Sequence, residues 1–135
     1  MHDRGMCHRD LKMTNILINN KGIVKIIDFG FATESQNKLR MYCGTPSYMP
    51  PEMVNKITYY GMPLDVWSLG VVLYKLLTGE YPFGAEKDPE LKNNIRNVNL
   101  EYPFFITPKC KDLIVRMLKV DPMSRLTISQ VFLGF

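Results

Sequence analysis

The sequence of 135 residues has only three cysteines, a single tryptophan and no long apolar run. No two cysteines have the CxxC spacing of zinc or redox sites, and three scattered thiols cannot build a disulfide framework. We therefore expect a reducing compartment inside the cell, either the cytoplasm or the nucleus. The longest apolar stretch, near residues 66–74, is far shorter than the roughly 18 residues of a membrane span. The sequence thus predicts a soluble chain without a membrane partner.

Blocks of like charge are also missing. The 17 basic and 13 acidic residues give a formal charge of +4 and are interspersed along the chain. A nucleic-acid-binding tail or stripe would gather its basic residues, so we interpret these charges as a solvated surface and expect no nucleic-acid partner. The length and the 46% hydrophobic content suit one globular domain.

The pattern predicts a mainly α-helical fold with one small β-hairpin. Two short strands at residues 16–18 and 23–27 flank a turn-rich segment at residues 19–22. Residues 29–62 show little periodicity, and a long irregular loop of this kind usually carries function.

Helices dominate the rest of the chain. Residues 64–78 are nearly all apolar between Pro63 and Gly79, which indicates a helix buried on nearly every face. Three amphipathic helices are predicted to follow, with start signals at Asp88-Pro89, at Thr107-Pro108 and at a capping box formed by Thr127 and Gln130.

Two strings in the first thirty residues carry the chemistry. Residues 8–15 read HRDLKMTN, and residues 28–30 read DFG on the far side of the hairpin. Both resemble the signature of the eukaryotic protein kinases. The lysine two residues after the aspartate resembles the serine/threonine type. The resemblance implies transfer of the γ-phosphoryl group of ATP, with Mg²⁺, to serine or threonine hydroxyls of protein substrates.

The resemblance also assigns roles. Asp10 is expected to accept the proton of the substrate hydroxyl, and Lys12 to neutralise charge on the moving phosphoryl group. Asn15 and Asp28 are the expected metal ligands, brought together by the hairpin. Further expected positions are Leu17 beneath the adenine, His8 and Phe29 in an apolar column between two lobes, and Arg9 and Gly30 as structural or regulatory residues.

A second set of landmarks follows in the order of the family. Residues 43–48 read CGTPSY and residues 50–52 read PPE, which resemble the substrate-docking loop and the Ala-Pro-Glu motif. Thr45, Pro46 and Tyr48 are thereby expected to contact substrate. Each residue alone could be an ordinary turn or core residue, but the joint order of the landmarks argues against that reading.

The later landmarks concern support of the site. Residues 65–70 read DVWSLG on the predicted buried helix, and in kinases this aspartate, here Asp65, binds the backbone of the catalytic loop. Arg125 is expected to pair with Glu52. The resemblance therefore covers residues 1–135 as a partial kinase domain, from the catalytic loop to the start of the last helix.

Kinase elements that lie upstream of the catalytic loop have no counterpart here. The Gly-rich loop, the strand lysine and the hinge are not in the sequence, so we expect the C-terminal lobe without the N-terminal lobe, and no activity from residues 1–135 alone. The alternative is a short kinase-like binding or scaffold module without catalysis. A pseudokinase is disfavoured because Asp10, Lys12, Asn15 and Asp28 are all present.

Two further departures bear on subgroup and regulation. Met41 stands where many kinases carry a phosphorylatable threonine, so the order that a phosphate brings must come from elsewhere; Thr33, Ser35 and Tyr42 are candidate substitutes. Pro50 replaces the usual alanine, as in aurora-type kinases, whereas the rest resembles the calcium/calmodulin-dependent and AMP-activated group.

Substrate preference is the last expectation. Thr14 and Lys75 stand where many arginine-selecting kinases carry glutamates. Loss of those carboxylates predicts a weak requirement for arginine two residues before the phosphorylated residue, unless Glu80 or Glu86 compensates.

Overall fold

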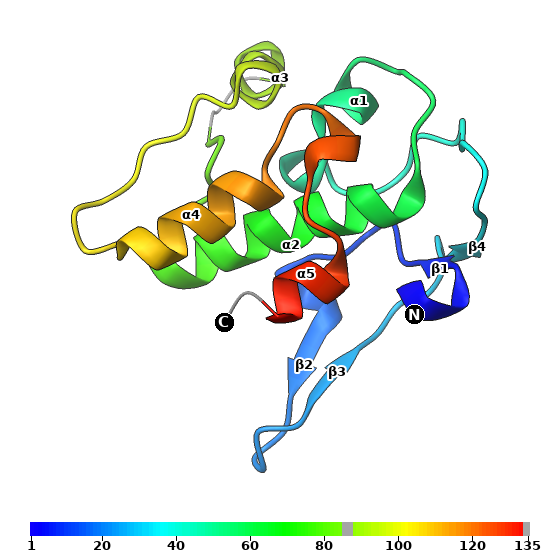
Figure 1. Cartoon of the computed structure of the whole chain (residues 1–135), viewed down its shortest axis with the longest axis horizontal. Coiled ribbons are helices and arrows are strands. Elements are labelled where there is room, and N and C mark those ends of the chain that lie inside the picture. Colours follow the sequence, from blue (N-terminus) through cyan, green and yellow to red (C-terminus); the bar gives the residue numbers. More distant parts are fainter. Residues whose placement is uncertain (85–87, 134–135) are drawn as a thin grey trace.

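One long central helix organises the molecule. The computed structural model describes residues 1–84 and 88–133. Helix α2 (Gly61–Thr78) crosses the middle of the body and the other helices pack around it (Figure 1). The remaining helices are α1 (Pro51–Val54), α3 (Asp88–Asn97), α4 (Pro108–Met117) and α5 (Ile128–Leu133), and the strands are β1 (Met6–Cys7), β2 (Ile16–Ile18), β3 (Val24–Ile26) and β4 (Thr33–Glu34).

Helix α2 starts three residues earlier than its apolar pattern predicts. Pro63 lies inside the first turn, where its missing N–H has no intrahelical partner to lose. The middle of the helix is buried as predicted, and Trp67 stacks on Phe83 with ring centroids 5.5 Å apart. The prediction of burial on nearly every face is wrong for the last turn, where Leu76 is 63% exposed. Gly79 ends the helix in the left-handed conformation.

The predicted helix starts after α2 are confirmed. Helix α3 begins at Asp88, and Thr107 caps α4 by accepting a hydrogen bond from the backbone N–H of Cys110. Thr127 and Gln130 form the reciprocal bonds of a capping box at α5. Helix α4 buries Leu113, Ile114 and Met117 against α2.

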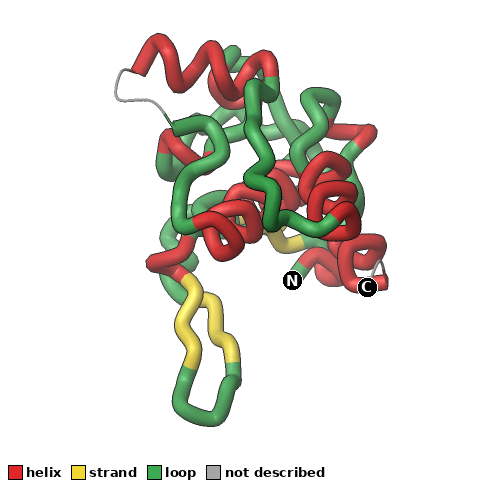
Figure 2. Tube along the Cα trace, turned by 90° about the vertical axis from the view of Figure 1, so that its left-hand side faces the viewer, coloured by secondary structure: helices red, strands yellow, loops and turns green. Residues whose placement is uncertain are grey.

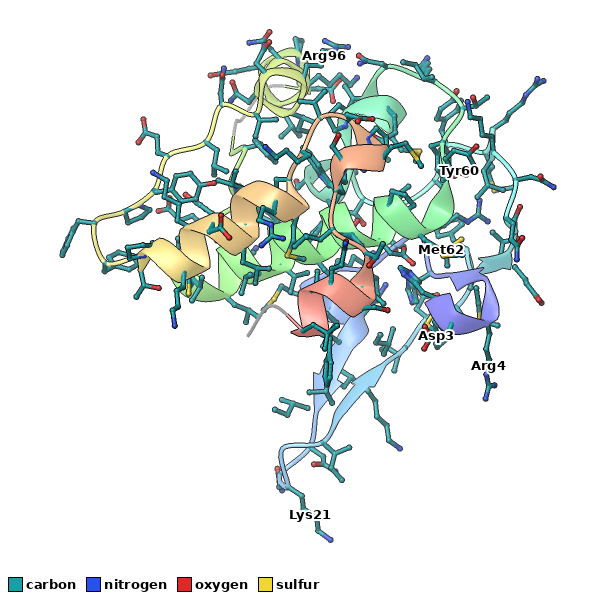
Figure 3. The ribbon with its side chains drawn as sticks, in the orientation of Figure 1. Asp3, Arg4, Lys21, Tyr60, Met62 and Arg96 are labelled. Carbon is teal, nitrogen blue, oxygen red and sulfur yellow. The ribbon has the colours of Figure 1, made fainter. Side chains whose placement is uncertain are left out.

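Two small antiparallel sheets complete the fold. Strands β2 and β3 form the predicted hairpin, with Ile16 opposite Ile26 and Leu17 opposite Lys25. The hairpin projects from the helical body, with Lys21 near its tip (Figures 2 and 3). Strand β1 pairs with β4, and this second sheet was not predicted.

Residues 29–62 are less irregular than their sequence predicts. They contain β4, a 3₁₀ turn at Pro46–Tyr48, helix α1, and an isolated bridge that pairs Leu39 with Tyr59. These pieces are too short to leave a periodic pattern in the sequence.

The start of α2 approaches strand β1 very closely. A methyl group added at Gly61 would lie 2.1 Å from the Sγ of Cys7, so only glycine fits there. Beside this contact, a cavity of about 270 Å³ is bordered by Asp3 and Met62 (Figure 3). Within the described residues, no helix has both the length and the apolar character needed to cross a lipid bilayer.

Candidate functional site

The loop of residues 8–15 is held in place by hydrogen bonds to Asp65 of α2. Asp65 is 1% exposed, and its two carboxylate oxygens accept the backbone N–H groups of His8 and Arg9, each at 2.8 Å. The Nε2 of His2 lies 2.9 Å from the same carboxylate. Bonds from backbone N–H groups to a buried carboxylate are strong because the acceptor is charged. The loop geometry is therefore set by main-chain contacts that reach across 56 and 57 residues.

Asp10 lies at the centre of a cluster of donors. One carboxylate oxygen accepts the hydroxyl of Thr45 at 2.9 Å, and the other lies 2.8 Å from the Nζ of Lys12. Lys12 also donates to the Thr45 hydroxyl at 3.1 Å, which closes a triangle of three side chains. The cluster joins the catalytic-loop string to the CGTPSY string, which lie 35 residues apart. A carboxylate held in this way can accept a proton from a hydroxyl placed beside it.

Asn15 is oriented by the same aspartate. Its side-chain nitrogen donates to the backbone carbonyl of Asp10 at 3.0 Å and to the Asp10 carboxylate at 3.4 Å. Because both partner atoms are hydrogen-bond acceptors, the atom of the Asn15 amide that faces Asp10 is the nitrogen. The amide oxygen of Asn15 accepts no hydrogen bond from the described residues. This leaves a hard oxygen ligand available.

Asp28 offers a second candidate oxygen ligand across the hairpin. The backbone N–H of Ile27 donates to the Asn15 carbonyl at 2.9 Å, so Asp28 directly follows the residue that is bonded to Asn15. Asp28 is exposed and has a left-handed backbone with φ of 62°, and one carboxylate oxygen accepts the Gly30 N–H at 3.3 Å. One carboxylate and one amide oxygen fit Mg²⁺, which usually takes one or two protein carboxylates and completes its shell with phosphates and water. No group of three or more His, Cys, Asp or Glu side chains suited to a metal occurs among residues 1–84 and 88–133.

His8 connects the loop to the DFG string. It is fully buried, and its Nδ1 accepts the Asp10 N–H while its Nε2 donates to the carbonyl of Ile27 at 3.0 Å. This pattern requires the tautomer that carries the proton on Nε2. The ring also meets Phe29 edge-on, with centroids 5.1 Å apart. His8 thus couples the position of Asp10 to that of Asp28.

Some predicted site residues lie at the edge and not inside the cluster. Leu17 is 50% exposed and Phe29 is 48% exposed, and both face open space on the hairpin side. Pro46 is also exposed, whereas Tyr48 is buried and its hydroxyl accepts the Met13 N–H at 3.4 Å. The docking loop is therefore fixed through Thr45 and Tyr48.

Lys75 contacts Tyr81, which in turn packs against Tyr48 of the docking loop. Its Nζ lies 3.4 Å from the centroid of the Tyr81 ring, which packs edge-on against Tyr48 at 5.5 Å. The neighbouring side chains of Lys75 and Tyr48 both lower the pKa of Tyr81. Glu80 is exposed and makes no ion pair with the described residues, and Glu86 lies outside them. Among the described residues, no carboxylate lies within ion-pair distance of Lys75.

Glu52 and Arg125 form the predicted pair. Both side chains are buried, and two guanidinium nitrogens donate to the two carboxylate oxygens at 2.6 and 2.7 Å. The pair ties α1, which follows the docking loop, to the segment before α5.

Comparison with known proteins bears on the identity of this site. The model of the family described as protein kinase domain matches residues 1–133. The chain belongs to the protein kinase family. Curated relatives are serine/threonine kinases, among them the serine/threonine-protein kinase kin-29 of Caenorhabditis briggsae, 40% identical over 97% of this chain.

Other relatives include one that is named as an aurora kinase. The mitosis inducer protein kinase cdr1 of Schizosaccharomyces pombe is 46% identical over 93% of this kinase chain, and an aurora kinase of Dictyostelium discoideum is 40% identical over 96%. The chain spans 16%, 22% and 34% of the length of these three relatives.

Several features of this kinase site had no signal in the sequence. His2 contacts Asp65, Arg9 adopts a left-handed backbone with φ of 69°, and Tyr59 contacts Arg9. Gly44 could have been found, since its φ of 102° and the 2.9 Å from its absent Cβ to the Arg9 carbonyl both require glycine. A glycine between a cysteine and a threonine in a docking loop is a signal of such a close approach.

Proposed function

We propose that this chain is the C-terminal, substrate-binding lobe of a serine/threonine protein kinase that transfers the γ-phosphoryl group of ATP to protein hydroxyls. The observation that carries the proposal is the triangle of Asp10, Lys12 and Thr45. It brings a carboxylate, a cation and the docking loop to one point, which is the arrangement that phosphoryl transfer to a hydroxyl needs.

Each residue then has a defined part. Asp10 accepts the proton of the substrate hydroxyl as the oxygen attacks phosphorus, and Lys12 balances charge on the transferred group. Bound Mg²⁺ and ATP supply the phosphoryl group and neutralise its oxygens. Asn15 and Asp28 would hold the metal, and Leu17 would contact the adenine. Thr45, Pro46 and Tyr48 position the substrate.

The remaining residues keep this geometry. Asp65 fixes the backbone of the catalytic loop, and the Glu52 and Arg125 pair anchors the docking loop from behind. His8 and Phe29 hold the DFG string against the loop, and the Gly30 N–H orients the Asp28 carboxylate within the string. We assign the protein to the interior of the cell, since its three thiols are free.

Replacement of Asp10 by asparagine tests the proposal. We expect the complete catalytic domain to phosphorylate a serine peptide with Mg²⁺ and ATP, and Asp10→Asn to lower kcat by about 10² to 10⁴ with an unchanged unfolding midpoint. Asp112→Asn is the matched control, because that carboxylate lies on the exposed face of α4 and bonds only to Arg116 among the described residues. Equal turnover of the two variants would refute the role of Asp10.

The alternative of a kinase-like binding module is favoured by one observation. The apolar side chains of the hairpin, such as Ile18 at 71% exposure, are open to a partner. Phosphate transfer by the complete catalytic domain distinguishes the two functions, because residues 1–135 alone are expected to be inactive under both. We expect this piece to show no phosphate transfer, and at most weak affinity for Mg²⁺ and ATP by calorimetry, because it contacts the nucleotide from one side only.

A further inference from the structure

Arg9 turns its charge away from Asp10 and into the protein. Its side chain is buried, and its Nε donates to the carbonyl of Phe31 at 2.6 Å. One terminal nitrogen donates to the hydroxyl of Tyr59 at 3.4 Å. No carboxylate lies within ion-pair distance of Arg9 among the described residues. A buried guanidinium is therefore satisfied here by uncharged oxygen acceptors.

Tyr59 connects this guanidinium to the segment of residues 39–45. It is 1% exposed, and its hydroxyl accepts from Arg9 while donating to the backbone carbonyl of Met41. Its own backbone pairs with Leu39 through hydrogen bonds of 2.8 and 3.1 Å. One residue thus fixes the segment through both its main chain and its side chain.

The fixed segment leads directly to the docking loop. Met41 is followed by Cys43, Gly44 and Thr45, and the Thr45 hydroxyl donates to Asp10. The contacts form a closed ring that runs from Arg9 through Tyr59 and Met41 to Thr45 and back to the catalytic loop. An uncharged tyrosine can maintain this ring because burial raises its pKa and keeps the hydroxyl protonated.

We propose that Tyr59 is a positioning residue whose hydroxyl holds residues 39–45 against the catalytic loop, so that ordering this segment requires no phosphate on it. The proposal rests on the proposed kinase function for its effect on catalysis, but not for its effect on order. Arg9 needs an acceptor in this location, and the Tyr59 hydroxyl provides it without a charge.

Tyr59→Phe is the direct test, and Tyr60→Phe is its matched control. Both changes delete one phenolic oxygen from neighbouring residues, but the Tyr60 hydroxyl makes no hydrogen bond with the described residues, and its contact with Lys38 uses the ring (Figure 3). Both variants and the wild type are prepared in the complete catalytic domain, with and without treatment by a protein phosphatase.

Hydrogen exchange of residues 39–45 is the first readout and does not depend on activity. We expect phosphatase treatment to leave exchange of the wild type unchanged, and Tyr59→Phe to speed it about tenfold while Tyr60→Phe does not. Faster exchange of the wild type after phosphatase treatment would overturn the proposal, as would equal exchange in the two variants. If Tyr59→Phe does not fold, the wild-type comparison alone decides.

Peptide kinetics form the second readout. Because residues 39–45 lead into the docking loop, Tyr59→Phe should raise the KM for a serine peptide about tenfold and leave the KM for ATP unchanged. A general loss of stability would not separate the two KM values. Equal changes in both constants would count against positioning. Absence of turnover in all three proteins would refute the proposed function and leave the exchange result to judge Tyr59.

Discussion

Arg125→Met should be among the most destabilising changes in this protein. The Arg125 side chain is fully buried and donates to both oxygens of Glu52 and to the backbone carbonyls of Pro63, Lys119 and Val120. Its guanidinium also lies 4.9 Å from the centre of the Trp67 ring. Methionine fills similar volume but leaves the Glu52 carboxylate buried without a partner.

The expected cost follows from that unpaired charge. Removing one partner of a buried ion pair typically costs about 3 to 5 kcal/mol, because the remaining charge has lost both water and its counter-ion. A domain of this size has a total free energy of unfolding of about 5 to 15 kcal/mol. The single change should therefore remove about a fifth of the stability or more.

Urea denaturation measures this cost, and Trp67 reports it. The ring of Trp67 is fully buried against Phe83 and is the one tryptophan of the chain, so its fluorescence changes when the core opens. Arg116→Met is the matched control, since its 3.4 Å pair with Asp112 is exposed on one helix face and is worth only about 0.3 to 0.5 kcal/mol. Replacing Glu52 and Arg125 together by methionine should recover part of the loss. The reasoning would be wrong if Arg125→Met cost no more than Arg116→Met.

Two other predictions concern selectivity and pH. Lys75→Glu should raise the phosphorylation rate of a peptide with arginine two residues before the serine about tenfold, relative to the same peptide with alanine at that position. The reason is that repulsion of the arginine near Tyr81 becomes attraction. A strong arginine preference in the wild type would contradict this prediction. Burial raises the pKa of Tyr48 and of Tyr102 to about 12. Unfolded tyrosines lose their proton near pH 10, so the stabilisation that comes from the two raised pKa values is complete below about pH 10. As the pH rises from about 10 to about 12, each of the two residues should lower the free energy of unfolding by about 1.4 kcal/mol per pH unit. Urea midpoints that stay constant over this range would refute the pKa assignment.

Local signals predicted the helices because their causes are local. The threonine caps before α4 and α5 act on residues three positions away, and the glycine after α2 acts on the preceding turn. A strand pair such as β1 with β4 leaves no comparable pattern, because each strand has two residues and their partner lies far along the chain.

The resemblance pointed to two long-range contacts that are present, but not to all contacts around the candidate site. It pointed to Asp65 and to the pair of Glu52 with Arg125, and both contacts are present. It gave no indication of the Tyr59 hydroxyl or of His2, because these depend on tertiary approach and not on a recognisable string. It also could not reveal the left-handed backbone of Asp28, a conformation that non-glycine residues hold only when their surroundings determine it.

The long sequence separations around the site have a consequence for biosynthesis. The catalytic loop is fixed by Asp65, and the helix that follows the docking loop is fixed by Arg125, 73 residues after its partner Glu52. Chain closure over such distances precedes any stabilising contact, and proteins emerge from the ribosome at only about 5 to 20 residues per second. The catalytic loop is translated before Asp65, so several seconds pass before the contacts that order the loop can form. During that interval its charged residues are open to solvent and to chaperones.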